Sequence, residues 1–221
     1  REGIRIDFYE PLSATGLQLA GGAVGFTLDT AYPADGRVFI TIAPERPQAF
    51  KLKLRLPPWA TGITLAVNGQ EAGVPLKAGE YAVLDRTWQN GDEVELHLGL
   101  AVRLRRNPAM TGIVGAAIQR GPEVLALDSR DNADLDLAAV TWPARPQLEP
   151  LLPTAEGRSR YRLQALVNKA PRAVVLTPLA DAGNDGASYR TICPVAVDRK
   201  RLARNTMSRI RHAAARRRAS E

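Results

Sequence analysis

Short runs in which polar and apolar residues alternate with period two constrain this chain most. The clearest is Lys51-Leu52-Lys53-Leu54-Arg55-Leu56, where the period places the leucines on one face of a sheet and the bases in solvent. Such runs recur every roughly 8 to 15 residues, with no convincing amphipathic helix between them, which favours antiparallel sandwiches over a parallel sheet. The other predicted strands are Val24 to Leu28, Val38 to Ile42, Ile63 to Val67, Tyr81 to Leu84, Val94 to Leu98, Val102 to Leu104, Val114 to Ile118, Val124 to Leu127, Tyr161 to Val167, Val174 to Leu176 and Tyr189 to Ile192.

The length of 221 residues accommodates two domains of this kind. We expect an all-β chain of two antiparallel, jelly-roll-like β-sandwiches at residues 1–100 and 101–198, with the option that the last strands return to the first domain, and a basic tail at 199–221. Asn68-Gly69 is the strongest hairpin-turn signal, because both residues tolerate a positive φ. Four prolines between Ala139 and Pro153 predict an extended loop or edge segment there.

The net charge of +7 is concentrated at the C-terminal end. Positions 199–221 hold nine of the 30 Lys and Arg residues and one of the 23 acids, so residues 1–198 are nearly neutral. The body therefore lacks the basic face of a nucleic-acid-binding domain. For the tail, a basic amphipathic helix that contacts nucleic acid or an anionic membrane is one interpretation. A disordered or frayed end is favoured, because the apolar positions, such as Met207 and Ile210, form a weak face.

The ends of the sequence say little about the compartment. The chain begins at Arg1 rather than Met, which suggests a fragment, so the missing signal peptide carries no information about export. No stretch approaches the 18 or so apolar residues of a membrane-spanning helix.

Residues suited to catalysis are few. The histidines are His97, which alternates with apolar residues and so predicts a solvent-facing strand position, and His212 in the basic tail. The single cysteine, Cys193, cannot form an internal disulfide or a multi-cysteine metal site, and a buried structural thiol is expected. Glu93 and Glu95 are expected to share one sheet face rather than flank a sugar.

Four acids, Asp128, Asp131, Asp134 and Asp136, suggest a calcium loop. Their spacing lacks the glycine and the terminal glutamate of an EF-hand, so a solvated loop is the favoured interpretation. No metal site is predicted within this chain.

The three tryptophans are the candidate carbohydrate contacts. Trp59 and Trp88 flank predicted strands, where their apolar area favours packing in a core or seam. For Trp142, in the proline-rich segment, packing and an exposed sugar-stacking face are equally supported.

Several motifs occur in a particular order. Pro57-Pro58-Trp59-Ala60 follows the Phe50 to Leu56 strand, and Val67-Asn68-Gly69, Gly79-Glu80-Tyr81 and Arg86-Thr87-Trp88-Gln89-Asn90-Gly91-Asp92 come next. This order resembles the first β-sandwich after the catalytic barrel in glycoside hydrolase family 127, the β-L-arabinofuranosidase group. Arg5 to Pro11 resembles the strand that leaves the barrel, and Ala117-Ile118-Gln119-Arg120-Gly121-Pro122 with Asp131-Asn132 resembles the second sandwich.

The resemblance implies that the catalytic groups lie in a separate domain. In the family an α/α barrel precedes the sandwiches and carries a cysteine nucleophile, a glutamate acid/base and a zinc ion held by cysteines and a glutamate. None of these residues can be assigned here, so the expectation is a non-catalytic accessory region that braces its own catalytic barrel or mediates homodimerisation. The alternative is a stand-alone carbohydrate-binding module.

Overall fold

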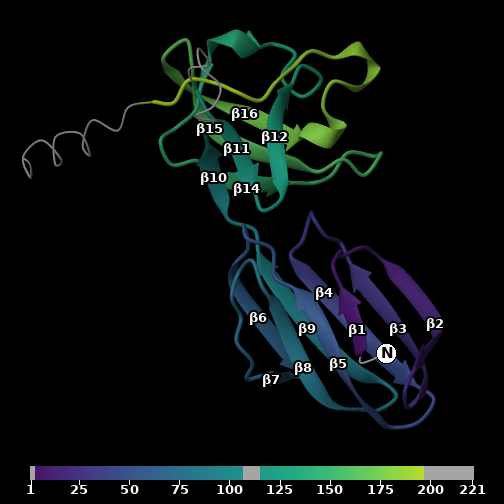
Figure 1. Cartoon of the computed structure of the whole chain (residues 1–221). Coiled ribbons are helices and arrows are strands. Elements are labelled where there is room, and N and C mark those ends of the chain that lie inside the picture. The colour runs from purple at the N-terminus through teal and green to yellow at the C-terminus, as the bar shows by residue number, and fades with distance from the viewer. Residues whose placement is uncertain (1–2, 107–114, 197–221) are drawn as a thin grey trace, which may run out of the picture. The chain divides into compact units, whose positions relative to one another are not determined.

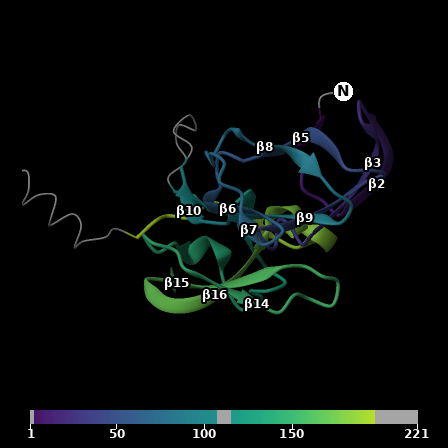
Figure 2. The same ribbon diagram turned by 90° about the horizontal axis from the view of Figure 1, so that it is seen from below.

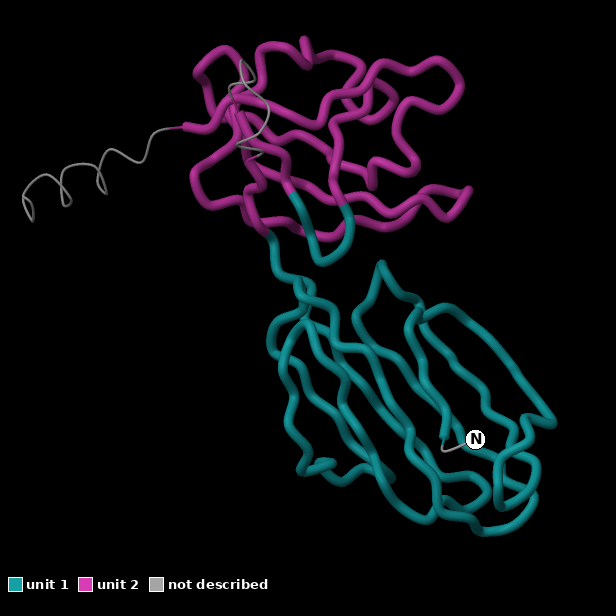
Figure 3. The backbone as a smooth tube through the Cα atoms, viewed as in Figure 1, with its two compact units in different colours: residues 1–102, 119–123 teal, residues 103–118, 124–221 magenta. Residues whose placement is uncertain are grey.

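The computed structural model describes residues 3–106 and 115–196, and these residues form an all-β protein, as predicted (Figure 1). They divide into two compact units (Figure 3). The first comprises Arg1–Val102 and Gln119–Glu123, and the second Arg103–Ile118 and Val124–Glu221. The predictions for the tail at 199–221, for His212 and for Val114 lie outside the described residues.

The first unit is a sandwich of two sheets. The smaller sheet has the order β1-β5-β8, with β1 (Gly3–Ile6) parallel to β5 (Gln48–Arg55) and β8 (Tyr81–Trp88) antiparallel to β5. The larger has the order β2-β3-β4-β9-β6-β7 and is antiparallel, with strands at Leu12–Leu19, Gly22–Thr30, Arg37–Pro44, Asp92–Gly99, Thr61–Val67 and Gln70–Glu71. Figure 2 shows β5 and β8 in one layer and β6 and β9 in the other.

The predicted alternation explains which residues fill this sandwich. Along β5, Leu52 and Leu54 are fully buried while Lys51 and Lys53 face solvent. Along β4, Val38, Ile40 and Ile42 are buried from the opposite sheet in the same way. The two inner faces interdigitate into one apolar core, as in other aligned sandwiches.

The second unit contains one sheet with the path β10-β11-β12-β16-β15-β13, which β14 joins through β15 and β17 through β12. The strands span Val102–Arg105, Ala117–Arg120, Glu123–Asp128, Ala170–Pro178, Arg160–Val167, Val140–Thr141, Leu148–Leu151 and Tyr189–Arg190, and short 3₁₀ helices cover Leu137–Ala139, Leu179–Asp181 and Asn184–Gly186. No helix in the described residues is long and apolar enough to cross a membrane.

Two local predictions are confirmed. Asn68 and Gly69 have φ values of 51° and 74° and join β6 to β7 as a two-residue hairpin turn. The proline-rich stretch contributes only the short strands β13 and β14, at the side of the sheet path. Pro150 can sit in β14 because an edge position does not need its missing N–H.

Candidate interaction surfaces

The Val-Asn-Gly and Trp-x-x-Gly-Asp motifs build one hydrogen-bonded corner of the first unit. Asn68 Nδ2 donates to Asp92 Oδ1 at 2.8 Å, and Asn68 Oδ1 accepts from the Glu93 backbone N–H at 2.8 Å. Asp92 Oδ2 accepts from the Gln89 N–H at 2.9 Å. These bonds to the ionised form hold the pKa of Asp92 below its usual value, although burial of the carboxylate opposes them. The two motifs therefore serve folding.

A row of aromatic rings explains two further motif segments. Tyr9 meets Tyr32 edge to face at 6.2 Å, and Tyr32 stacks on Trp59 at 6.2 Å. The Tyr9 hydroxyl donates to the Arg55 carbonyl at 2.6 Å, and burial raises its pKa. Gly121 lies beside this row, because a Cβ there would lie 2.5 Å from Leu100 Cδ2 and 3.4 Å from Trp59 Cζ3.

The Gln-Arg-Gly-Pro segment is the end of β11 and the turn that follows it, and residues 119–123 belong to the first unit. Arg120 donates from both terminal nitrogens to the carbonyls of Pro33 and Ala34, at 3.2 and 2.9 Å. Gln119 Nε2 donates to the Gly121 carbonyl at 2.7 Å. This segment anchors the loop before β4.

The tryptophans differ in their access to solvent. Trp88 and Trp142 are fully buried, and their indole N–H groups donate to the carbonyls of Phe50 at 3.0 Å and Ala116 at 2.9 Å. Neither ring can stack on a sugar in this structure, so the candidate contact at these two positions is replaced by core packing. Trp59 is half-buried, and its sugar contact stays a prediction.

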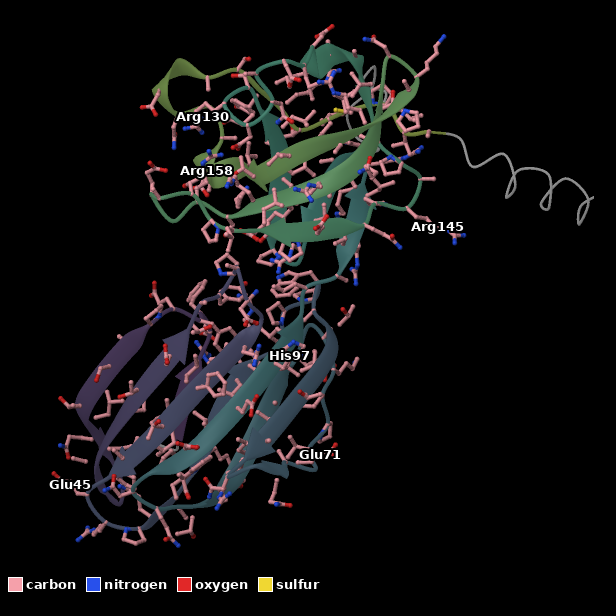
Figure 4. All side chains as sticks on the ribbon, turned by 180° about the vertical axis from the view of Figure 1, so that it is seen from behind. Glu45, Glu71, His97, Arg130, Arg145 and Arg158 are labelled. Atoms are coloured by element: carbon pink, nitrogen blue, oxygen red, sulfur yellow. The ribbon has the colours of Figure 1, made fainter. Side chains whose placement is uncertain are left out.

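His97 lies on the outward face of β9 and is partly exposed (Figure 4). Glu93 and Glu95 share that face, as expected from the alternation. Cys193 is fully buried.

We expect the Cys193 thiol to be inert while the protein is folded. Burial raises its pKa to about 11, so about one thiol in a thousand is ionised at pH 8. Ellman's reagent at pH 8 should label the native protein slowly and the chain in 6 M guanidinium rapidly. Rapid labelling of the native protein would contradict this expectation.

The interpretation of the second unit's acids as a solvated loop is wrong for two of them. Asp128 is fully buried: its Oδ1 accepts from Arg130 Nε at 3.0 Å and its Oδ2 from Arg130 Nη2 at 2.8 Å and from the Gly183 N–H at 3.0 Å. The side chain of Asp131 is 6% exposed and pairs with Arg158. Asp134 pairs with Arg172 at the surface, and Asp136 caps a 3₁₀ helix.

Arg130 and Arg158, which Figure 4 labels, also line a polar hollow of about 730 Å³ in the second unit, together with Glu156, Gly157, Asp181, Asn184 and Asp185. Both guanidinium groups already bind carboxylates. The hollow is therefore lined by an internally neutralised network rather than by free cations.

The donor set does not fit the zinc site that the family implies. Thiolate ligation of zinc needs several cysteines, whereas the sequence has one, with a buried thiol. The described residues also contain no group of three or more His, Cys, Asp or Glu side chains placed to hold a metal.

The outer face of the three-stranded sheet is the first candidate surface, which we call the basic face. It carries Arg5 on β1, Lys51, Lys53 and Arg55 on β5, and Tyr81 and Val83 on β8. The register places Arg5, Lys53 and Val83 in one cross-strand row and Arg55 beside Tyr81. Phe8, which follows β1, is 75% exposed.

Charges on the basic face are only partly paired. Arg5 binds Asp7 at 3.1 Å and Lys51 binds Asp85 at 3.7 Å, whereas Lys53 and Arg55 make no ion pair in the part of the chain that the structure describes. Arg5 and Lys53 lie directly opposite each other, and like charges in such a pair destabilise a sheet. The face thus combines uncompensated positive charge with exposed apolar groups.

Comparisons with known proteins show which family the chain resembles. Residues 3–100 match the family model described as "Beta-L-arabinofuranosidase, GH127 middle domain". None of the curated proteins compared matches the chain. Among solved structures, one described as a glycoside hydrolase is 29% identical over 89% of this chain and 36% of its own, with a TM-score of 0.77.

Two further structures agree. The GH127 β-L-arabinofuranosidase of Geobacillus stearothermophilus T6 is 27% identical over 88% of this chain and 34% of its own, with a TM-score of 0.76. A GH127 β-arabinofuranosidase at 21% identity shares the fold, with a TM-score of 0.77 over 88% of this chain and 35% of its own. This chain thus spans about a third of the length of the structures it matches. Residues 3–100 match the middle domain of glycoside hydrolase family 127, and the chain has the fold of the corresponding part of solved GH127 enzymes.

Proposed function

We propose that this chain is a non-catalytic accessory region of a β-L-arabinofuranosidase-type enzyme and that its basic face docks on the catalytic domain of the same protein. The observation that carries the proposal is the basic face itself. Lys53 and Arg55 present unpaired charge beside the exposed side chains of Val83 and Tyr81. Charged and aromatic side chains together are typical of an interface that is polar at its rim and apolar at its centre.

The position of β1 supports this choice of surface. β1 begins at Gly3 and pairs with β5 alone, so it is an edge of its sheet. A domain that precedes a middle domain would join the chain at this edge. An acidic surface on that domain would neutralise Lys53 and Arg55, and would reduce the repulsion between Arg5 and Lys53.

The catalytic groups and the zinc ion belong, in this proposal, to the docked domain. The sandwich would contribute by holding that domain in its folded form. Homodimerisation through the basic face is the competing role, although two copies of one basic surface repel each other in a symmetric contact.

Charge reversal tests the docking. In the full-length protein, Lys53→Glu combined with Arg55→Glu should lower the Tm of the catalytic domain by about 4 °C, the shift that corresponds to about 2 kcal/mol of lost interfacial charge pairing. Differential scanning calorimetry measures this shift. In the chain alone the same variant should leave stability within about 0.5 kcal/mol, since both side chains are exposed.

Arg103→Glu on β10 is the matched control, because Arg103 is also exposed but lies outside the basic face. It should leave the Tm of the catalytic domain unchanged. If Lys53→Glu combined with Arg55→Glu destabilised the chain alone as much as the full-length protein, the basic face would stabilise its own sandwich rather than bind the catalytic domain. A dimer of the chain alone that the double variant dissociates, measured by light scattering, would assign the surface to self-association.

A further inference from the structure

The outer face of the six-stranded sheet carries a second surface, which we call the acidic hollow. It has a volume of about 370 Å³ and is lined by Thr27, Asp29, Phe39, Ile40, Thr41, Gly69, Glu93, Val94 and Glu95. Its outward side chains come from three neighbouring strands, β3, β4 and β9. The hollow lies within the first unit and shares no residue with the basic face.

The strand register arranges these side chains in two rows. One row runs Asp29, Phe39, Glu95, so that a carboxylate stands on each side of an aromatic ring. The next runs Thr27, Thr41, Glu93. Neighbouring strands are about 4.8 Å apart, so the backbones that carry Asp29 and Glu95 are about 9.6 Å apart across the ring.

The carboxylates of the hollow are available to a ligand. The carboxylate groups of Asp29, Glu93 and Glu95 make no ion pair or hydrogen bond with another side chain within the described residues. By contrast, Asp85 and Asp92, elsewhere in the same sandwich, are paired with bases. Unpaired carboxylates are strong acceptors, and hydrogen bonds to them are roughly twice as strong as those between neutral groups.

The apolar element of the hollow is Phe39, which is 45% exposed. It occupies an outward position of β4, between Arg37 and Thr41, where the alternation otherwise supplies polar residues. A single exposed apolar side chain is ordinary on a protein surface. At the centre of a concave, polar hollow, however, it offers a flat face against which a ligand ring can pack.

Hydrogen-bond donors flank the carboxylates. The Thr27 and Thr41 hydroxyls can both donate and accept, and the row on the other side of Phe39 runs Arg37, His97, Thr64. A cationic peptide would meet Arg37 there, and an anion would meet the three carboxylates. A neutral polyol can use both kinds of group, since each of its hydroxyls donates and accepts.

We propose that the acidic hollow binds a neutral sugar unit. The apolar face of the sugar ring packs on Phe39, its hydroxyls donate to Asp29 and Glu95 on either side, and Glu93 with the two threonines holds a neighbouring ring or substituent. A span of about 9.6 Å between the carboxylate-bearing strands accommodates one ring with a hydrogen bond at each edge. This site is distinct from the basic face and from Trp59.

Titration of the full chain with neutral trisaccharides tests the site. The probes are cellotriose, xylotriose and arabinotriose, followed by amide chemical shifts in ¹H–¹⁵N NMR spectra. At least one probe should shift the amides of residues 27–29, 39–41 and 93–95. Phe39→Thr, which keeps a good strand former at that position, should weaken binding about tenfold, and Asp29→Asn combined with Glu95→Gln should weaken it further.

Tyr189→Thr is the matched control, because it removes a similarly exposed aromatic side chain from β17, outside both the acidic hollow and the basic face. It should leave the affinity unchanged. Trilysine and trigalacturonic acid are the charged comparison ligands, and neither should bind as well as the neutral probe. Binding of trilysine without any neutral sugar, shifts centred on Trp59, or equal affinity in Phe39→Thr would each overturn the proposal.

Discussion

Replacing Trp88 with alanine is expected to lower the free energy of unfolding of the first sandwich by about 3–5 kcal/mol, the cost of deleting a buried aromatic side chain and leaving a cavity. Trp88 is fully buried, stacks on Phe50 with ring centroids 5.8 Å apart, and is covered by the Arg86 guanidinium at 5.2 Å. A chain with two units need not unfold in one step. Hydrogen–deuterium exchange of peptides from residues 3–100 under increasing urea measures this unit alone.

Two variants make the Trp88 prediction specific. Trp88→Phe keeps an apolar ring but loses the indole N–H that donates to the Phe50 carbonyl, so it should cost about 1 kcal/mol plus a smaller cavity contribution. Trp59→Ala removes the same side chain from a half-buried position and should cost about 1–2 kcal/mol. Equal losses in Trp59→Ala and Trp88→Ala would contradict a core role that is specific to Trp88.

The sequence predicts strands well where one face is buried. β4, β5 and β9 alternate strictly, and the alternation puts Leu52, Ile40 and Leu96 in the core. β2 (Leu12–Leu19) was not predicted, because most of its side chains are exposed and few are apolar. Its register with β3 is also interrupted between Ala14 and Leu17. Its hydrogen bonds come from β3, so its own pattern carries little signal.

The sequence alone predicts the candidate surfaces only in part. The alternation of β4 already places Phe39 outward, beside Arg37 and Thr41. That Asp29 and Glu95 stand on either side of Phe39 follows from the sheet order β3-β4-β9, in which β4 and β9 are far apart in the chain. Long-range pairing of this kind has no local sequence signal. The family motifs, by contrast, were recognisable because they lie in turns whose local hydrogen bonds need particular residues, such as Asn68 and Asp92.

The burial of Asp128 likewise depends on long-range contacts that have no local sequence signal. A cluster of acids after a strand suggests a solvated loop, and Arg130, two residues later, is the local sign of pairing. The Gly183 N–H, which also binds the carboxylate, is 55 residues away in sequence. The buried environment of Asp128 therefore depends on the fold of the whole second unit.

We expect Asp128→Asn to destabilise the second unit by about 3 kcal/mol, at the lower end of the range for breaking a buried pair. The amide that replaces Oδ2 would face donors from Arg130 Nη2 and the Gly183 N–H, and Arg130 would lose its buried counter-charge. Arg130 is partly exposed and keeps the Asp181 carbonyl at 2.6 Å, which limits the loss. Hydrogen–deuterium exchange of peptides from residues 124–196 measures this unit.

The pH dependence of stability distinguishes the contribution of the Asp128 charge from that of its packing. The Arg130 side chain, through its hydrogen bonds, holds the pKa of Asp128 at about 2, below the usual value of 3.8 for an aspartate. Because the folded-state pKa is depressed, the stabilisation is fully present well above pH 4 and is lost as the pH falls through about 2. The difference between wild type and Asp128→Asn should therefore shrink by about 2 kcal/mol between pH 6 and pH 2. Asp134→Asn, which breaks an exposed aspartate–arginine pair, should cost less than about 1 kcal/mol at pH 6. If the stability difference between wild type and Asp128→Asn stayed constant down to pH 2, the destabilisation would come from altered packing rather than from loss of the buried ion pair.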